Sequence, residues 1–289
     1  MTSTIYDLGY QRYSGARFGR MHAVKTLFIF SFRGAFGLGR GERSRLIPLL
    51  VLVLVFLPAV VQIGVASAAG MINLISYANY LEFTAGLLAL FVAAQAPELL
   101  VTDKSNGTLA LYLSRPIRAS DYAWAKLGAL AAALLLLTLG PQLMLFVGRV
   151  LIQAEPWTAF MAEWTKLFPI LAGTLLVSTY FASIALAISS FANKRAFASA
   201  GVIAFFLLTP AISAMVRVIA TGDLRRYAIL LNPVNLVTGF SKWLFDVESA
   251  RRSTVARVDL PGETYLFVVL ATCVIGALVL LARYRKNEV

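Results

Sequence analysis

Six separate apolar runs are the feature that most limits what this chain can fold into. Each is long enough to cross the roughly 30 Å of hydrocarbon in a bilayer, which takes about 20 helical residues. The runs are Leu46 to Ala69, Leu81 to Leu100, Leu127 to Ile152, Leu167 to Phe191, Ala196 to Ile219 and Tyr265 to Leu281. Because backbone polar groups inside lipid must be satisfied within the protein, the runs predict six membrane-spanning helices.

The remaining composition indicates a single membrane domain. Of the 289 residues, 59% are hydrophobic and 14% are charged, whereas soluble domains contain about 25% charged residues. No polar domain separates the apolar runs. We therefore expect an all-α integral membrane protein, with an N-terminal segment over residues 1–45 and a six-helix transmembrane domain over residues 46–289.

The positive charges predict the orientation. The two termini and the loops after the second and fourth runs carry 17 Lys and Arg residues, and the other loops carry 9. Because short cytoplasmic loops are rich in Lys and Arg, both termini are expected in the cytoplasm. The net charge of +12 follows the membrane pattern, so nucleic acid is not an expected partner.

The first apolar run could instead be a cleaved signal peptide, because Ala66 to Ala68 resemble a cleavage site. A signal peptide has a short basic region and an apolar core of about 7–15 residues. Here a basic region of about 45 residues comes first, and the apolar run is longer than such a core. A spanning helix is the preferred interpretation.

Two further segments are expected to form helices without crossing the membrane. The stretch from Met21 to Gly39 is apolar between spaced cations, which predicts an interfacial amphipathic helix, in contact with lipid, with the bundle, or with both. The outer loop over residues 221–264 contains several aromatic residues, and Pro233 interrupts any single helix. Short re-entrant or surface-lying helices are expected there.

Several classes of function lack the residues that they need. His22 is the only histidine and Cys273 the only cysteine, and the chain has no HExxH motif and no phosphate-binding loop. Ion-coupled carriers usually keep ionisable residues inside the membrane, but here Glu98 alone comes close, where water can reach it. The intramembrane Gln, Ser and Thr residues are more typical of hydrogen bonds between helices. We therefore expect neither an enzyme nor a stand-alone secondary carrier.

The polar connection over residues 102–125 contrasts with the apolar runs beside it. Ser105 to Gly107 are typical turn and capping residues, and Pro116 ends any helix that follows them. A short helix "TLALYL" is expected between these points. Ser120 and Asp121 are suited to begin the next helix, with Tyr122, Trp124 and Lys126 expected as an interfacial belt. From these residues alone, an ordinary basic loop and a rigid lever remain equally good interpretations.

The same connection resembles the signature of the permease subunits of ABC type-2 exporters. The matching order is an acid, Gly-Thr-Leu, an apolar turn, Ser-Arg-Pro, a polar connection and a late lysine. These positions are Asp103, Gly107, Thr108, Leu109, Tyr112, Leu113, Ser114, Arg115, Pro116, Asp121, Tyr122 and Lys126. The six-helix order, the basic N-terminal segment and the Asn232-Pro233 pair extend the resemblance. Upstream, where the family often has paired charges, Glu98 and Asp103 are separated, which leaves open which acid makes the family's contact.

The resemblance implies a non-catalytic subunit that works with separate proteins. The expected partners are a dimer of ABC ATPase subunits, a second copy of this chain or a similar permease, and membrane lipids, in a bacterial cytoplasmic membrane. No cofactor is expected in this chain, since ATP and Mg would bind the ATPase. The residues implied to contact the ATPase are Asp103, Gly107, Thr108, Leu109, Tyr112, Leu113, Arg115, Pro116 and Arg118, with Glu98 and Asp121 as possible additions.

The implied function is ATP-driven export. The charge-poor membrane interior favours an amphipathic or lipid-like substrate over small ions. The alternative is a membrane subunit that transports nothing and transmits the movement of the ATPase to an outer partner through residues 221–264.

Overall fold

The computed structural model describes residues 19–39, 41–69, 75–108, 117–248, 253–258 and 260–285, and the secondary structure in these ranges is helical. The helices are α1 (Arg20–Ala35), α2 (Leu46–Ala69), α3 (Tyr77–Ser105), α5 (Ala119–Ile152), α6 (Pro156–Glu163), α7 (Leu167–Phe191), α8 (Arg195–Ile219), α9 (Gly222–Tyr227), α10 (Pro233–Leu244), α11 (Thr254–Val258) and α12 (Gly262–Arg285). Short 3-10 turns precede α2, α7 and α10.

Within these ranges, six helices are long and apolar enough to cross a membrane: α2, α3, α5, α7 with the preceding α6, α8 and α12. The predicted all-α membrane fold is therefore confirmed. Several helices extend past the predicted runs, because a helix continues beyond the hydrocarbon wherever its ends are capped. The N-terminus of α3 is an example, since the Ser76 side chain accepts a hydrogen bond from the backbone N–H of Asn79 at 3.2 Å.

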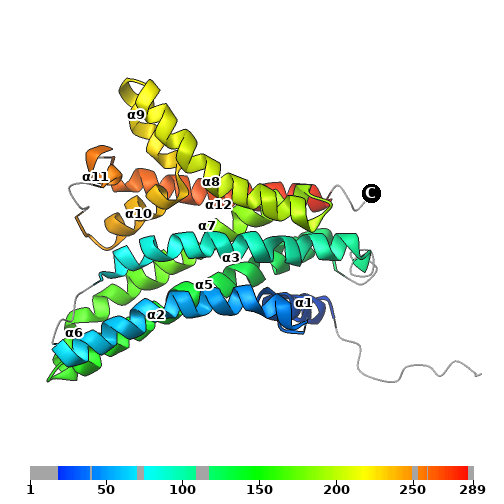
Figure 1. Cartoon of the computed structure of the whole chain (residues 1–289). Helices are drawn as coiled ribbons and strands as arrows, with labels where there is room; N and C mark the ends of the chain where they lie inside the picture. Colours follow the sequence, from blue (N-terminus) through cyan, green and yellow to red (C-terminus); the bar gives the residue numbers. More distant parts are fainter. Residues whose placement is uncertain are drawn as a thin grey trace, which may run out of the picture.

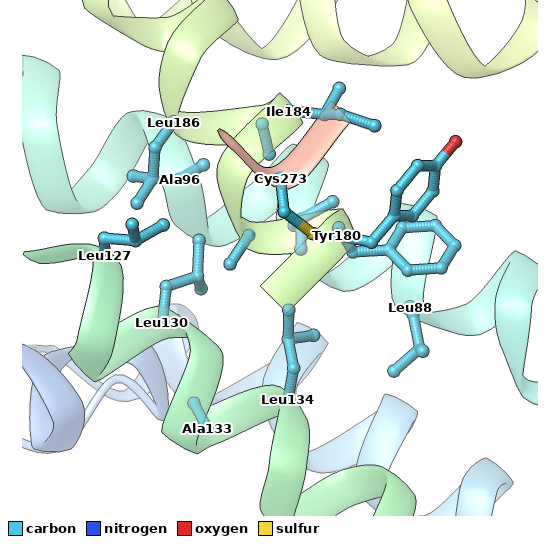
Figure 2. Packing of buried hydrophobic residues seen from close by; sticks show 14 of the residues in the cluster. Leu88, Ala96, Leu127, Leu130, Ala133, Leu134, Tyr180, Ile184, Leu186 and Cys273 are labelled. Atoms are coloured by element: carbon cyan, nitrogen blue, oxygen red, sulfur yellow. The ribbon is translucent and has the colours of Figure 1, made fainter. Parts of the chain in front are cut away.

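The core of the bundle lies around α7. This helix packs against α3, α5 and α12, while α2 packs on the outer side of α5. Leu88, Leu134, Tyr180 and Cys273 come from four different helices and meet in this core (Figure 2). By contrast, α8 buries few residues and leaves most of its apolar surface exposed. That surface is available to lipid or to another subunit.

The segment expected as an interfacial helix forms α1, which packs against α5 and α3. Leu27 and Ala35 are buried in this contact, while Met21 and Phe30 are exposed on the other side. The expected contact with the bundle is therefore confirmed, and contact with lipid stays a prediction. One face of α1 meets the bundle, and the other presents apolar side chains outward, as an interfacial helix does.

The loop over residues 221–264 contains the expected short helices α9, α10 and α11. Asn232 caps α10 by accepting hydrogen bonds from the N–H groups of Val234 and Asn235, at 2.9 and 3.4 Å, and Pro233 occupies the first helical turn, where its missing N–H costs nothing. α10 packs against α3 and α12. In Figure 1, α6, α9, α10 and α11 lie at one end of the bundle, and α1 and the end of α12 lie at the other.

Candidate functional site

Of the eleven residues predicted to contact an ATPase, those that the structure describes lie at the α1 end of the bundle, where α3 ends and α5 begins (Figure 1). Five of the eleven lie outside the residues that the structure describes: Leu109, Tyr112, Leu113, Arg115 and Pro116. The coupling helix expected there therefore stays a prediction. The remaining six flank it on both sides and are described: Glu98, Asp103, Gly107, Thr108, Arg118 and Asp121.

Asp103 joins the end of α3 to the start of α5. Its carboxylate lies 2.6 Å from the Lys126 ammonium nitrogen and accepts a hydrogen bond from the Tyr122 hydroxyl at 2.8 Å. Tyr122 and Lys126 are four residues apart and so share one face of α5. The Lys126 side chain is only 2% exposed. We call the cluster of Asp103, Tyr122 and Lys126 the α3–α5 joint.

Burial of this charge pair requires good compensation. Removing both ions from water costs several kcal/mol each, about as much as their attraction returns unless hydrogen bonds complete the site. The Tyr122 hydroxyl supplies one such bond to Asp103, and its ring lies 5.3 Å from the Lys126 nitrogen. The Tyr284 ring of α12 packs on Tyr122 with 5.1 Å between ring centroids. The joint is therefore held by three helices.

The prediction of an interfacial belt at the start of α5 is wrong for two of its three residues. Trp124 is 53% exposed, as a belt residue should be, but Tyr122 and Lys126 are buried. Successive side chains of a helix point about 100° apart, so residues two positions apart lie on nearly opposite faces. Trp124 therefore faces outward, while Tyr122 and Lys126 face α3. The sequence shows the residue types but not this rotation.

The chain leaves α3 through a tight turn. The Asn106 N–H donates to the Thr102 carbonyl at 3.0 Å, and Gly107 has a φ of 70°. That left-handed conformation strains most residues other than glycine. The Thr108 hydroxyl then donates to the Asp103 carbonyl at 3.0 Å. The predicted turn is confirmed.

The start of α5 is fastened to α1. Asp121 accepts the backbone N–H of Arg118 at 3.1 Å. It also forms two parallel hydrogen bonds, each 2.6 Å long, with the Arg20 guanidinium. The hydrogen bonds to Asp121 raise the pKa of Arg20 above its ordinary value. Both Asp121 oxygens therefore have partners within the chain.

Glu98 was expected where water reaches it, but it is 8% exposed and forms an ion pair with Arg195 at the start of α8. Close by in the chain, the Lys104 ammonium donates to the Asn193 side chain at 2.6 Å. These contacts fasten the end of α3 to the α7–α8 turn. Glu98 and Asp103 thus each have a cationic partner within the chain.

Sequence analysis did not identify Arg20, Asn193, Arg195 or Tyr284 as part of this site. All four lie in segments that the charge pattern places on the same side as the connection. That pattern gives the side of the membrane but does not say which residues pair, since the partners are about 90 or more positions apart. The helix-joining role of polar residues is confirmed in one case, where Thr138 and Ser178 lie 3.1 Å apart between α5 and α7.

The contacts at this end of the bundle link several helices to one another. Among the described residues, no group of three His, Cys, Asp or Glu side chains is placed to hold a metal ion. What the residues build is a set of ionic and hydrogen-bonded contacts that connect α1, α3, α5, α8 and α12 around one connecting segment.

Comparison with known proteins agrees with this geometry. No curated protein matches the sequence. A family model described as ABC-2 family transporter protein matches residues 19–289. This match spans most of the chain and includes every helix described above, so the protein belongs to the ABC-2 family of membrane transport proteins.

Proposed function

We propose that this chain is the permease subunit of an ATP-driven exporter and that residues 102–125 receive force from a separate ATPase. The observation that carries the proposal is the α3–α5 joint. Buried contacts from Asp103 to Lys126 and Tyr122 hold both flanks of the connection to the bundle. A connection held rigidly at both flanks can transmit a push, whereas a loose loop would absorb it.

The surrounding contacts support the same role. Arg20 with Asp121, and Arg195 with Glu98, link the connection to the N-terminal helix and to the α7–α8 turn. A push at the connection would thus tilt α3 and α5 together with their neighbours. We place this end of the bundle in the cytoplasm, in agreement with the distribution of Lys and Arg. A bacterial plasma membrane fits that arrangement.

ATP and Mg would bind the partner ATPase. Two ATPase subunits would form a dimer on the cytoplasmic side of two permease subunits. The second permease would be another copy of this chain or a similar one, and the exposed apolar side of α8 offers a surface for it. The substrate that best fits the charge-poor interior is amphipathic or lipid-like.

The coupling contact can be tested by replacing Tyr112 and Leu113 together with Ala. These residues lie three and four positions after Leu109 and form one apolar face with it on the expected helix "TLALYL", so we expect the ATPase to be largely lost from the purified complex. Membrane insertion should remain, since the apolar runs are unchanged. The measurement is co-purification of the ATPase in mild detergent, with the amount of inserted permease as the reference.

A matched control replaces Trp157 and Met161 together with Ala. Both are exposed on α6 at the opposite end of the bundle. It removes an aromatic and an apolar side chain of similar size and should leave co-purification unchanged. Equal ATPase recovery with the Tyr112 and Leu113 variant and with this control would contradict the coupling assignment.

The alternative function, mechanical transmission to an outer partner, is favoured by the packing of α10. Lys242 of α10 lies 3.8 Å from Glu82 of α3, and the Ser241 hydroxyl donates to the Ala78 carbonyl at 3.4 Å. Movement of α3 would therefore reach the loop over residues 221–264. Export by the permease and ATPase reconstituted in vesicles supports the first function. ATPase activity that depends on the permease but moves no lipid or amphipathic molecule supports the second function.

A further inference from the structure

A second cluster of charged side chains lies at the end of the bundle opposite the α3–α5 joint. A cavity of about 230 Å³ opens there between the first turn of α3, α5, the start of α7 and the end of α10. Its lining includes Ser76, Tyr77, Arg149, Lys166 and Phe245. Because a buried water needs only about 10–15 Å³ of such space, the cavity can hold a phosphate group with water around it.

Arg149 is a buried cation in the lining of this cavity. It is only 4% exposed, and its guanidinium donates to the Ile75 carbonyl at 2.5 Å and lies 4.3 Å from the centre of the Tyr77 ring. Its Nε is buried and has no hydrogen-bond partner among the described residues. Arginine stays protonated in proteins, and an unsatisfied buried donor on a charged group is costly. Arg149 therefore places a permanent positive charge in the wall of the cavity.

The neighbouring charges leave the cavity positive. Glu163 accepts hydrogen bonds from the Lys166 ammonium at 2.8 Å and from the Tyr77 hydroxyl at 3.2 Å. This carboxylate is thus shared by Lys166 and Tyr77, and none of the carboxylates in the described ranges forms an ion pair with Arg149. Two cations therefore face one carboxylate at this cavity.

The first turn of α3 adds to the positive potential. α3 is 29 residues long and begins at Tyr77, and the N-terminus of such a helix carries a partial positive charge with unpaired N–H groups. Helix N-termini of this kind bind phosphate readily. Ser76 and Arg149 also lie close to the ends of two apolar runs, so we expect them near the depth of the lipid headgroups.

We propose that this cavity binds a phosphate group, with Arg149 and Lys166 as its cationic ligands and the start of α3 as a third source of positive charge. Planar Arg donors match phosphate oxygens, and Lys binds phosphate as a point charge. The group can belong to an anionic lipid headgroup or to phosphate in solution. The proposal concerns binding alone and does not depend on export.

The test uses the full-length chain purified in mild detergent. Native mass spectrometry compares retention of phosphatidylglycerol with that of phosphatidylcholine, and thermal unfolding compares inorganic phosphate with chloride at equal ionic strength. We expect Arg149→Gln to weaken phosphate or phosphatidylglycerol binding about tenfold or more. Lys166→Gln should weaken it severalfold. Arg225→Gln removes an exposed arginine of α9 at the same end and should leave binding unchanged.

The two probes distinguish the sources of the phosphate. Selective retention of phosphatidylglycerol that both variants reduce supports a lipid headgroup site, and stabilisation by inorganic phosphate that both reduce supports a soluble ligand. If Arg149→Gln does not fold, Lys166→Gln decides, because the Lys166 side chain is 45% exposed and its loss leaves the packing intact. The proposal is overturned if the wild-type chain binds neither probe selectively, or if Lys166→Gln binds both as well as the wild type.

Discussion

Replacing Asp103 by Asn is expected to lower the free energy of unfolding by about 3–5 kcal/mol, the cost of breaking a buried ion pair on one side. The Lys126 side chain is 2% exposed, so its ammonium would lose its carboxylate without gaining water. The change would also weaken the hydrogen bond from the Tyr122 hydroxyl, because a carboxylate is a stronger acceptor than an amide. Unfolding of the purified chain by heat or by denaturing detergent measures the effect.

Two further variants show whether the loss comes from the pair. In Asp103→Asn with Lys126→Met, no buried charge is left without its partner, so part of the stability should return. Asp223→Asn makes the same chemical change at an exposed position of α9 and should have little effect. If the double variant lost more free energy of unfolding than the two single variants lose together, the assignment of Asp103 and Lys126 as a stabilising pair would be contradicted.

Replacing Gly276 by Ala is expected to destabilise the packing of α12 against α7 by about 1–3 kcal/mol, the range for an overfilled core. A Cβ atom at this position would lie 2.9 Å from the Ser183 Cβ and 3.0 Å from the Ser183 carbonyl carbon and oxygen. The backbone of α7 cannot move aside as a flexible side chain can. Small residues permit such close contact between helices in a membrane.

Gly86 provides the matched control. It lies on α3, and a Cβ atom there would meet nothing within 4 Å. Gly-to-Ala replacement gains about 1 kcal/mol of helix propensity at either site, so the difference between the two variants isolates the contact. Thermal unfolding of both in the same detergent measures it. Equal stability of the two would show that α12 does not approach α7 as closely as described.

If the α3–α5 joint transmits force, the Asp103 variant should also uncouple the complex. ATPase co-purification would remain, because the predicted coupling helix is unchanged, while export per ATP hydrolysed would fall. The Tyr112 and Leu113 variant should show the opposite defect, because it should lose the ATPase itself from the complex. Comparing the two separates attachment of the ATPase from transmission of its movement.

The sequence alone was sufficient for the number, order and approximate positions of the spanning helices, because the transfer of an apolar run into a bilayer depends on local composition. It was also sufficient for the turn at Gly107, where a positive φ favours glycine, and for the family, through the connection after α3. The helix ends were less certain, since α3 and α5 extend beyond their apolar runs under the control of capping contacts.

The tertiary structure alone decided which side chains meet. Lipid tails and the interior of the bundle are both apolar, so the hydrophobic pattern of a spanning helix does not reveal which face is buried. For that reason Lys126 was expected at the interface but lies inside, and Glu98 was expected near water but pairs with Arg195. The cavity around Arg149 likewise depends on the rotation of α5 and its distance from α3, which contacts far apart in the chain determine.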